Sequence, residues 1–333
     1  MPAFTYANPR TIHWGAGSIA QLRAEVERLE APRVALVTTR SLLVSVERLA
    51  IAPVTTAVIS QHAPMVEIRA ATEDIGLAGA RAIVSFGGGS AIDAAKIISV
   101  NLAGRDGRAL PHVAVPTTLS VAELAAGAGY TNDAGDKAGM RDPRLLVDTV
   151  IYDAELTLMT PLELWLSTGI RALDHAVEGY LAGGVHPFND VMALEAIRRL
   201  FSSLPLARAQ PDSAAIRTEN QLAAWFSFTL PGPSAAGLSH TMGKQIGARY
   251  AIPHGVTSCL LLPHVMRFLA PRMPDRMEAL PSPEAVYDLI ASLDLPQHIA
   301  AYGIGEKELR RAADELAGTF SASDLLSIYL SAL

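Results

Sequence analysis

The segment that most restricts the fold of this chain is residues 82–101, which read AIVSFGGGSAIDAAKIISVN. A β-branched, apolar run ends at Phe86, three glycines follow, and a helical pattern begins at Ser90. Glycines at the carboxyl end of a strand let backbone N–H groups approach a phosphate, and the next helix N-terminus favours anions. The spacing fits neither the G-x-G-x-x-G fingerprint nor a Walker A loop. The segment predicts a phosphate-binding strand–turn–helix unit; the alternative is an ordinary tight turn.

Short apolar runs rich in β-branched residues recur through the first half of the chain. Besides the run at residues 82–86, they occupy residues 34–37, 54–59, 112–115 and 149–152. Such runs are typical of parallel strands that are buried on both faces. Helical patterns lie between them, so the sequence predicts an α/β domain with a parallel sheet.

After Asp153 the helical period dominates, as in residues 161–183 and 189–204. We therefore expect an α/β domain over residues 1–153 and a helical domain over residues 154–333. Four prolines in the second part predict breaks between helices. They are Pro205, Pro231, Pro233 and Pro253.

Composition excludes several classes of protein. The formal net charge is −6 and basic blocks are absent, which argues against a nucleic-acid surface. We find no uninterrupted apolar run of about 18 residues, so we expect no membrane span. The first residues lack the pattern of a secretory signal, and we expect a cytoplasmic protein. Cys259 is the single cysteine, which excludes an internal disulfide and a multi-cysteine zinc site.

Two further groups of residues are candidates for chemistry. Thr117 and Thr118 follow the run at residues 112–115, at the sheet edge where ligands of α/β proteins bind. They could equally form an ST-turn or a helix cap.

In the helical part, Arg171 and His175 lie four residues apart, as do His240 and Lys244, while His254 is expected in a loop. The histidines could act together as metal ligands or acid–base groups. Each taken singly is more often a surface or core histidine.

Several segments together resemble the iron-type (group III) alcohol dehydrogenase superfamily, and most closely its maleylacetate reductase branch. They include FTYANPRTIHWGAGSI, GGGSAIDAAK, VPTTLSVAE, STGIRALDHAVEGY and GLSHTMGKQIGARYAIPHG. The resemblance covers residues 4–268. It implies the dehydroquinate synthase-like fold of iron-type alcohol dehydrogenases: an α/β dinucleotide-binding domain, an all-helical domain and an active site in the cleft between them. It also implies an NAD(P) cofactor, a small-molecule substrate and a homodimer.

The resemblance assigns cofactor contacts to the glycine turn, the threonine loop and the family lysine. The residues are Gly88, Gly89, Ser90, Asp93, Thr117, Thr118 and Lys137. The family's acidic residue for the adenine ribose is replaced by Thr39, and Arg40 follows it. Loss of a carboxylate and gain of a cation would accommodate a 2′-phosphate, so we expect NADPH to be accepted.

The metal site is where the sequence departs from the superfamily. The three histidines that match metal ligands are His175, His240 and His254. Arg171 stands where metal-dependent relatives have an aspartate, and a guanidinium has no lone pair for a cation. Maleylacetate reductases resemble the chain here, since they carry asparagine and work without metal. Lys244 replaces a further family histidine, and Asp174 could stand in for the lost ligand.

The sequence therefore predicts an NAD(P)H-dependent reductase or dehydrogenase of a small, anionic carbonyl or alcohol, acting without metal. Its candidate catalytic residues are Arg171, His175, His240, Lys244 and His254. Three alternatives stay open at this point: a metal-dependent alcohol dehydrogenase with rearranged ligands, a catalytically degenerate nucleotide-binding protein, and a lyase or cyclase on the related sugar-synthase scaffold.

Overall fold

The structure is a computed structural model that describes most of the chain. The described residues are 9, 11–182, 186–229 and 237–333. Pro231, Pro233 and most of residues 4–10 of the resemblance lie outside them. Contacts between Cα atoms divide the chain into two compact units: residues 1–160 with 213–221, and residues 161–212 with 222–333. Among the described helices, none is both long and apolar enough to cross a bilayer.

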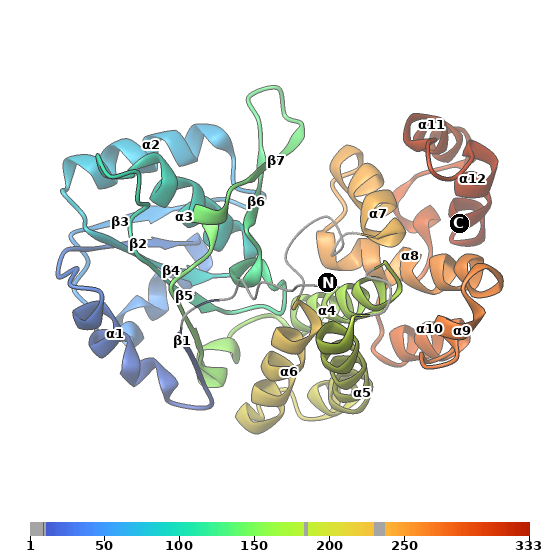
Figure 1. Ribbon diagram of the computed structural model, residues 1–333, viewed down its shortest axis with the longest axis horizontal. Helices are drawn as coiled ribbons and strands as arrows, with labels where there is room; N and C mark the ends of the chain where they lie inside the picture. Colours follow the sequence, from blue (N-terminus) through green and yellow to red (C-terminus); the bar gives the residue numbers. More distant parts are fainter. Residues whose placement is uncertain (1–8, 10, 183–185, 230–236) are drawn as a thin grey trace. The chain divides into compact units, whose positions relative to one another are not determined.

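The first unit is built on a parallel sheet in the order β1-β8-β5-β4-β2-β3 (Figure 1). Its strands are β1 (Thr11–Trp14), β2 (Val34–Thr38), β3 (Thr55–Val58), β4 (Ala82–Gly87), β5 (His112–Pro116) and β8 (Thr149–Tyr152). Every neighbouring pair is parallel. The parallel sheet predicted from the apolar runs is confirmed, and the edge strand β1 is added to it.

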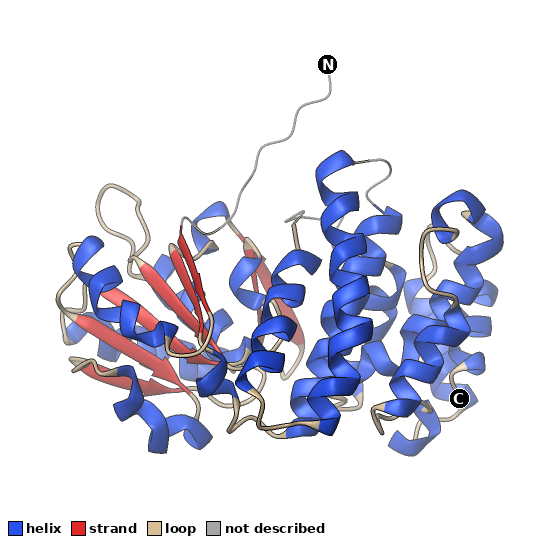
Figure 2. Cartoon of the chain, turned by 90° about the horizontal axis from the view of Figure 1, so that it is seen from below, coloured by secondary structure: helices blue, strands red, loops and turns tan. Residues whose placement is uncertain are grey.

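The strands are apolar throughout because both faces of the sheet are covered. Ala35 and Val37 pack on one face with α2 and α3, whereas Val34 and Leu36 pack on the other with α1 and η2. Figure 2 shows helices on both sides of the red strands. The covering elements are α1 (Leu22–Arg28), η2 (Arg40–Leu49), α2 (Met65–Leu77) and α3 (Gly89–Asn101). Short 3-10 turns complete the unit: η1 (Ser18–Gln21), η3 (Ala122–Leu124), η4 (Pro143–Leu145) and η5 (Ala154–Thr157).

An antiparallel hairpin, β6 (Gly127–Thr131) with β7 (Lys137–Arg141), was not predicted from the sequence. Its strands, GAGYT and KAGMR, are rich in glycine and alanine and lack an apolar alternation. The hairpin is held by α3, whose Asp93 accepts a hydrogen bond from the backbone N–H of Gly129 at 2.9 Å. Tertiary contact, rather than local propensity, therefore fixes this element.

The regular elements described in the second unit are all helical. They are α4 (Leu162–Ala182), α5 (Pro187–Ala209), α7 (Leu238–Arg249), α8 (His254–Leu269), η7 (Ala270–Arg272), α9 (Pro274–Met277), α10 (Pro283–Ser292), η8 (Ile299–Tyr302), α11 (Glu306–Leu316) and α12 (Ala322–Ser331); α6 (Ala214–Ser227) contributes to both units. One core joins α7, α8, α11 and α12 through side chains such as Ile246, Leu261 and Ile328. The central helix α4 is buried on all sides from Trp165 to Leu181, which isolates its polar residues from water.

The break predicted at Pro205 is wrong, because α5 continues through this proline to Ala209. A proline inside a helix loses one hydrogen bond and crowds the preceding turn. Leu200, Leu204 and Ala207 are all buried on this helix, and their packing holds the last turns in place. The break predicted at Pro253 is confirmed, since this residue caps α8.

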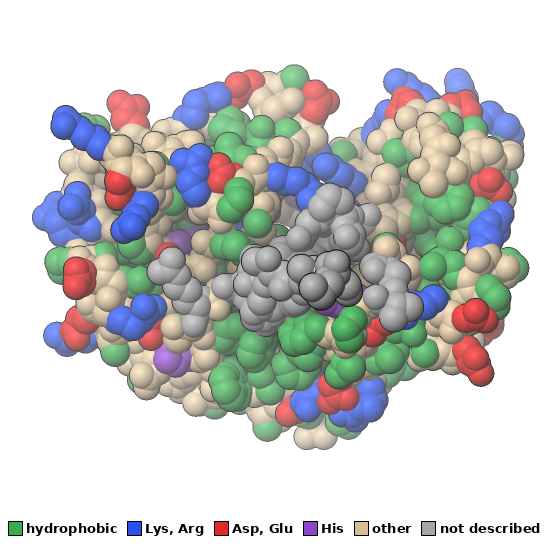
Figure 3. Space-filling view, viewed as in Figure 1, with side chains coloured by type: hydrophobic (Ala, Val, Ile, Leu, Met, Phe, Trp, Pro, Cys, Tyr) green, Lys and Arg blue, Asp and Glu red, His purple; other side chains and the backbone are tan. Residues whose placement is uncertain are grey.

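Charged side chains of both signs are interspersed on the face shown in Figure 3, without a block of one sign. This distribution agrees with the absence of basic blocks in the sequence. The face shown therefore lacks the basic stripe that is typical of nucleic-acid-binding proteins.

Candidate active site

The first candidate site lies where the connections of two neighbouring strands leave for opposite faces of the sheet. Thr38 at the end of β2 pairs with Phe86 in β4. The chain then continues from β2 into η2 on one face and from β4 into α3 on the other. A Cβ added to Gly87 would lie 3.8 Å from Cγ2 of Thr39, so the two strand ends are adjacent. Ligands of open α/β sheets bind at such a switch point.

The glycine turn after β4 is packed too closely for larger residues. A Cβ at Gly87 would lie 2.9 Å from that of Ala91, and a Cβ at Gly88 would lie 2.9 Å from Cγ2 of Thr118. Gly88 caps α3, which begins at Gly89. The glycines therefore bring the backbone of the helix N-terminus against the threonine loop, where first-turn N–H groups can receive an anion.

Two buried hydroxyl groups face this turn without a hydrogen-bond partner among the described residues. They are Oγ1 of Thr118, a residue only 7% exposed, and Oγ of Ser120. Oγ of Ser120 would lie 3.3 Å from a Cβ at Gly89. Buried polar atoms normally have partners, so these two fit a ligand with hydrogen-bonding oxygens. The backbone of Thr117 holds the loop against the turn, because its N–H donates to the carbonyl of Gly87.

The threonine loop is tied to α3 by a buried lysine. Nζ of Lys96 donates to the carbonyl oxygens of Ala122 and Gly127, both at 2.6 Å. It also lies 3.7 Å from a carboxylate oxygen of Asp93. Asp93, expected at the cofactor, thus has one oxygen on the hairpin and the other near Lys96. Lys96 and Asp93 together fix the threonine loop and the hairpin against α3.

The remaining predicted cofactor residues lie at the edges of the same unit. Thr39 has its hydroxyl 3.3 Å from that of Ser41, and Arg40 is exposed at the start of η2. Lys137 begins β7 and donates from Nζ to Oγ1 of Thr131 at 3.2 Å. Burial lowers the pKa of Lys137 to about 8, so the residue is still mainly a cation at neutral pH.

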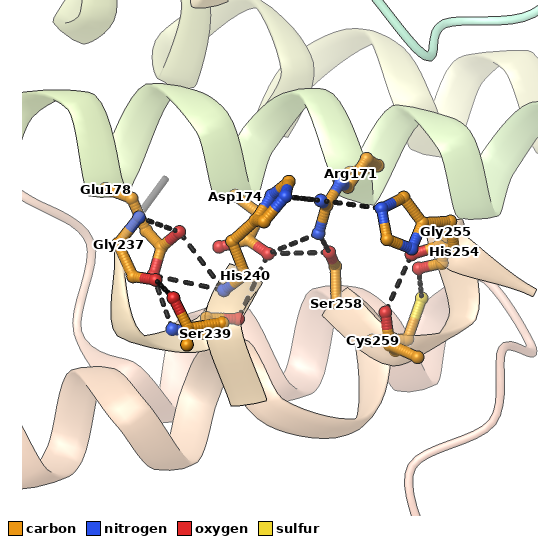
Figure 4. Close-up of polar contacts among 12 residues, drawn as sticks. Arg171, Asp174, Glu178, Gly237, Ser239, His240, His254, Gly255, Ser258 and Cys259 are labelled. Carbon is orange, nitrogen blue, oxygen red and sulfur yellow. Dashed lines mark hydrogen bonds and ion pairs between the residues drawn. The ribbon is translucent and has the colours of Figure 1, made fainter. Parts of the chain in front are cut away.

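The second candidate site is a buried polar cluster around Arg171 in the helical unit (Figure 4). Arg171 is 3% exposed. Its Nη1 donates to Oγ of Ser258 at 2.9 Å and lies 3.4 Å from a carboxylate oxygen of Asp174. Its Nη2 contacts the ring of His240 and lies 3.3 Å from Nε2 of His254. The guanidinium therefore occupies the space between two of the three family histidines.

These contacts define the protonation of His240. A guanidinium N–H can only donate, so the ring nitrogen that it contacts must present a lone pair. Burial lowers the pKa of His240 far below its usual range, and the charge of Arg171 lowers it further. His240 is therefore neutral at physiological pH.

Two buried carboxyl groups on α4 hold the cluster together. Asp174 accepts hydrogen bonds from Ser258 at 2.6 Å and from Ser239 at 3.0 Å, which ties α4 to α8 and α7. Glu178 accepts from the N–H groups of Gly237 and Ser239, at the N-terminus of α7. Burial raises the pKa of both carboxyl groups. The charge of Arg171 opposes this rise in both groups.

The other predicted residues lie around this cluster. The ring centroid of His175, which is buried, lies 5.6 Å from that of His240, and His254 lies 5.4 Å from His240. His254 is the exposed first residue of α8, so its predicted position in a loop is wrong; Pro253 caps the helix immediately before it. Lys244 has an exposed side chain, and its charge is among those that lower the pKa of His240.

Sequence reasoning missed one partner of Arg171, the hydroxyl of Ser258. Ser258 lies four residues after His254, a spacing that places both on one face of α8, but serine at that position carries no signal of its own. The shared helical face of Arg171, His175 and Glu178, in contrast, follows from their spacing of four and seven residues, and all three lie on α4.

Comparison with known proteins places these features in one family. Residues 9–154 match "Iron-containing alcohol dehydrogenase", and residues 165–321 match "Fe-containing alcohol dehydrogenase family, C-terminal". The maleylacetate reductase of Rhizobium sp. (strain MTP-10005) is 30% identical over 94% of this chain and 91% of its own length. That of Sphingobium indicum is 31% identical over 92% and 88%. The crystal structure of maleylacetate reductase from Agrobacterium tumefaciens superposes with a TM-score of 0.89 at 28% identity, covering 100% of this chain and 99% of that one.

The chain belongs to the iron-containing alcohol dehydrogenase family. It is accordingly an NAD(P)-dependent oxidoreductase with the fold of that family. The expected fold class is confirmed.

The metal that gives the family its name does not fit the donor set of this chain. Within the described residues, no three His, Cys, Asp or Glu side chains are arranged to hold a metal ion. The point between His240 and His254 is taken by a cationic guanidinium, which repels a metal ion and cannot ligate it. Oδ2 of Asp174 accepts from Ser239, Ser258 and Arg171, whereas its Oδ1 is buried without a hydrogen-bond partner among the described residues.

Proposed function

We propose that the chain is an NAD(P)H-dependent reductase of a small anionic carbonyl compound of the maleylacetate type, acting without a metal ion. The position of Arg171 carries the proposal: a buried guanidinium contacts two of the histidines that match metal ligands. Arginine binds carboxylates through paired hydrogen bonds, so a position unsuited to a metal suits an acidic substrate. The relatives named maleylacetate reductase support the same substrate class.

In this proposal residues 1–153 bind the cofactor and residues 154–333 carry the catalytic side chains. The glycine turn fits a pyrophosphate, because it joins a helix N-terminus to the unpartnered hydroxyl of Thr118. The residues that would hold the cofactor are Thr39, Arg40, Gly88, Gly89, Ser90, Thr117, Thr118 and Lys137, with Asp93 fixing the hairpin beside them.

The nicotinamide, when bound, supplies or accepts the hydride. Reduction places negative charge on the substrate oxygen, whether hydride reaches a carbonyl carbon or a double bond conjugated to one. We assign the binding of the anionic group to Arg171 and the stabilisation of the oxygen to the ring N–H of neutral His240. His254 is exposed and can pass a proton from solvent. The ring of His175 packs beside the ring of His240, and the exposed Lys244 adds positive charge.

The function is tested by following NADPH oxidation by the purified chain with maleylacetate and with a neutral ketone of similar size. We expect turnover of the anionic substrate, with a much higher KM for the neutral one. Cofactor binding without turnover across a panel of carbonyl compounds would instead identify a catalytically degenerate protein.

The cofactor preference has its own test at Arg40. This residue follows Thr39 at the switch point and is exposed, without a described ion pair. Arg40→Ala is expected to raise the Kd for NADPH about tenfold and to leave that for NADH within twofold, because only NADPH carries the 2′-phosphate. Fluorescence titration of both cofactors measures this. Equal losses of affinity for NADPH and NADH would show that Arg40 does not bind the 2′-phosphate.

The family resemblance, rather than a contact seen in this chain, leads us to propose a cytoplasmic homodimer. Sedimentation of the purified protein tests the oligomeric state.

A further inference from the structure

The turn between β3 and α2 adopts an unfavourable backbone conformation. His62 and Ala63 are consecutive and both have positive φ angles, 69° and 48°. Residues with a Cβ rarely adopt this left-handed region. Such a conformation persists only where the surrounding structure enforces it, and it is concentrated at functional positions.

Thr131, at the end of β6, holds this turn. Its backbone N–H donates to the carbonyl of Ala63 at 3.2 Å, and its Oγ1 donates to the carbonyl of His62 at 3.2 Å. Thr131 also forms an isolated parallel bridge with Pro64. On the other side of the turn, the N–H and the hydroxyl of Ser60 both donate to the carboxylate of Glu67. The turn is thus fixed at both ends.

The strained turn also orients the hydroxyl group of Ser90 at the proposed cofactor site. The N–H of His62 donates to Oγ of Ser90 at 2.9 Å. Ser90 is the second residue of α3, directly after the glycine turn. Because its oxygen accepts this bond, the hydroxyl proton of Ser90 is directed away from His62 and can donate to a ligand.

The same threonine hydroxyl also fixes Lys137. Nζ of Lys137 donates to Oγ1 of Thr131 at 3.2 Å, so this oxygen accepts from Lys137 and donates to His62. Among the described residues Lys137 has no ion pair with a carboxylate, and its charge lowers the pKa of the nearby His62. One hydroxyl group therefore positions a cation and, through the turn, a serine hydroxyl.

We propose that Thr131 is a positioning residue for cofactor binding, which aims the Lys137 ammonium and the Ser90 hydroxyl at a dinucleotide. The inference rests on the proposed function, because it takes Ser90 and Lys137 as cofactor contacts. A residue that only positions ligand groups sets cofactor affinity, while the rate at saturating cofactor depends on the separate cluster around Arg171.

The test compares Thr131→Val with Thr131→Ser. Valine keeps the shape and the backbone N–H but removes the hydroxyl, whereas serine keeps the hydroxyl. We expect valine to raise the Kd for NADPH and NADH about 10- to 100-fold, as loss of a hydrogen bond to a charged group does. Serine should stay within threefold of the wild-type Kd. The rate at saturating cofactor should change less than threefold in both.

Thr72→Val is the matched control, since it removes a threonine hydroxyl that donates to the carbonyl of Ile68 within α2. It should leave cofactor Kd unchanged, and thermal unfolding of all three variants reports any general loss of stability. A wild-type Kd in Thr131→Val, or a serine variant as weak as valine, would overturn the inference. If the wild-type chain itself binds neither cofactor, the proposed function fails first.

Discussion

Arg171→Ala is expected to raise the KM for an anionic carbonyl substrate by about 30-fold to several thousand-fold. Removing the partner of a buried, hydrogen-bonded charge costs roughly 2–5 kcal/mol, and each 1.4 kcal/mol is a factor of ten. Arg171 meets this description, because it is 3% exposed and its guanidinium is fixed by Ser258 and Asp174. Steady-state kinetics with maleylacetate and a neutral ketone measure the effect. The KM for maleylacetate should rise, and that for the neutral ketone should change little.

Two comparison variants separate charge recognition from damage to the fold. Arg171→Ala also leaves Asp174 buried without its cation, so thermal unfolding must be measured alongside the kinetics. Arg171→Lys keeps the charge but not the planar pair of donors, and it should fall between wild type and alanine. Lys244→Ala should change the KM less than tenfold, because an exposed charge interacts weakly. Equal losses for anionic and neutral substrates would show that Arg171 does not bind the anion.

The parts of the fold that the sequence predicts are those that depend on local pattern and on burial of whole elements. The parallel strands were recognisable because Ala35 and Val37 face one side while Leu36 faces the other, and both sides are apolar. The hairpin of β6 and β7 was not, because its glycine- and alanine-rich strands are held by Asp93 and Lys96 of α3. The course of α5 through Pro205 likewise depends on packing around it.

The residues of the candidate sites also fall into two groups: those that a sequence motif indicates and those that only the fold reveals. Arg171 and the three histidines could be aligned with a family pattern, since each occupies a recognisable position in a motif. Ser258 and Thr131 could not, because their importance comes from the groups they join across the fold. A single serine or threonine has the same local sequence signal wherever it lies. Contacts of this kind appear only once the tertiary structure is known.

Substitution of Arg171 by aspartate is expected to create a metal site in the space that the guanidinium now fills. The ring centroids of His175 and His254 lie 5.6 and 5.4 Å from that of His240, near enough for the rings to turn toward one ion once the guanidinium is removed. The guanidinium now blocks this space. A shorter carboxylate would remove the repelling cation and complete four ligands.

Metal analysis after dialysis against zinc should therefore give about one ion per chain for Arg171→Asp and far less than one for wild type. Arg171→Asn is the matched control: it opens the same space without an anionic ligand and should bind much more weakly, since a neutral amide is a poor zinc ligand. Wild-type activity should survive incubation with EDTA. Stoichiometric zinc or iron in the wild-type enzyme, lost together with activity on chelation, would refute both this prediction and the metal-free mechanism, because Arg171 would then have to move aside for a metal.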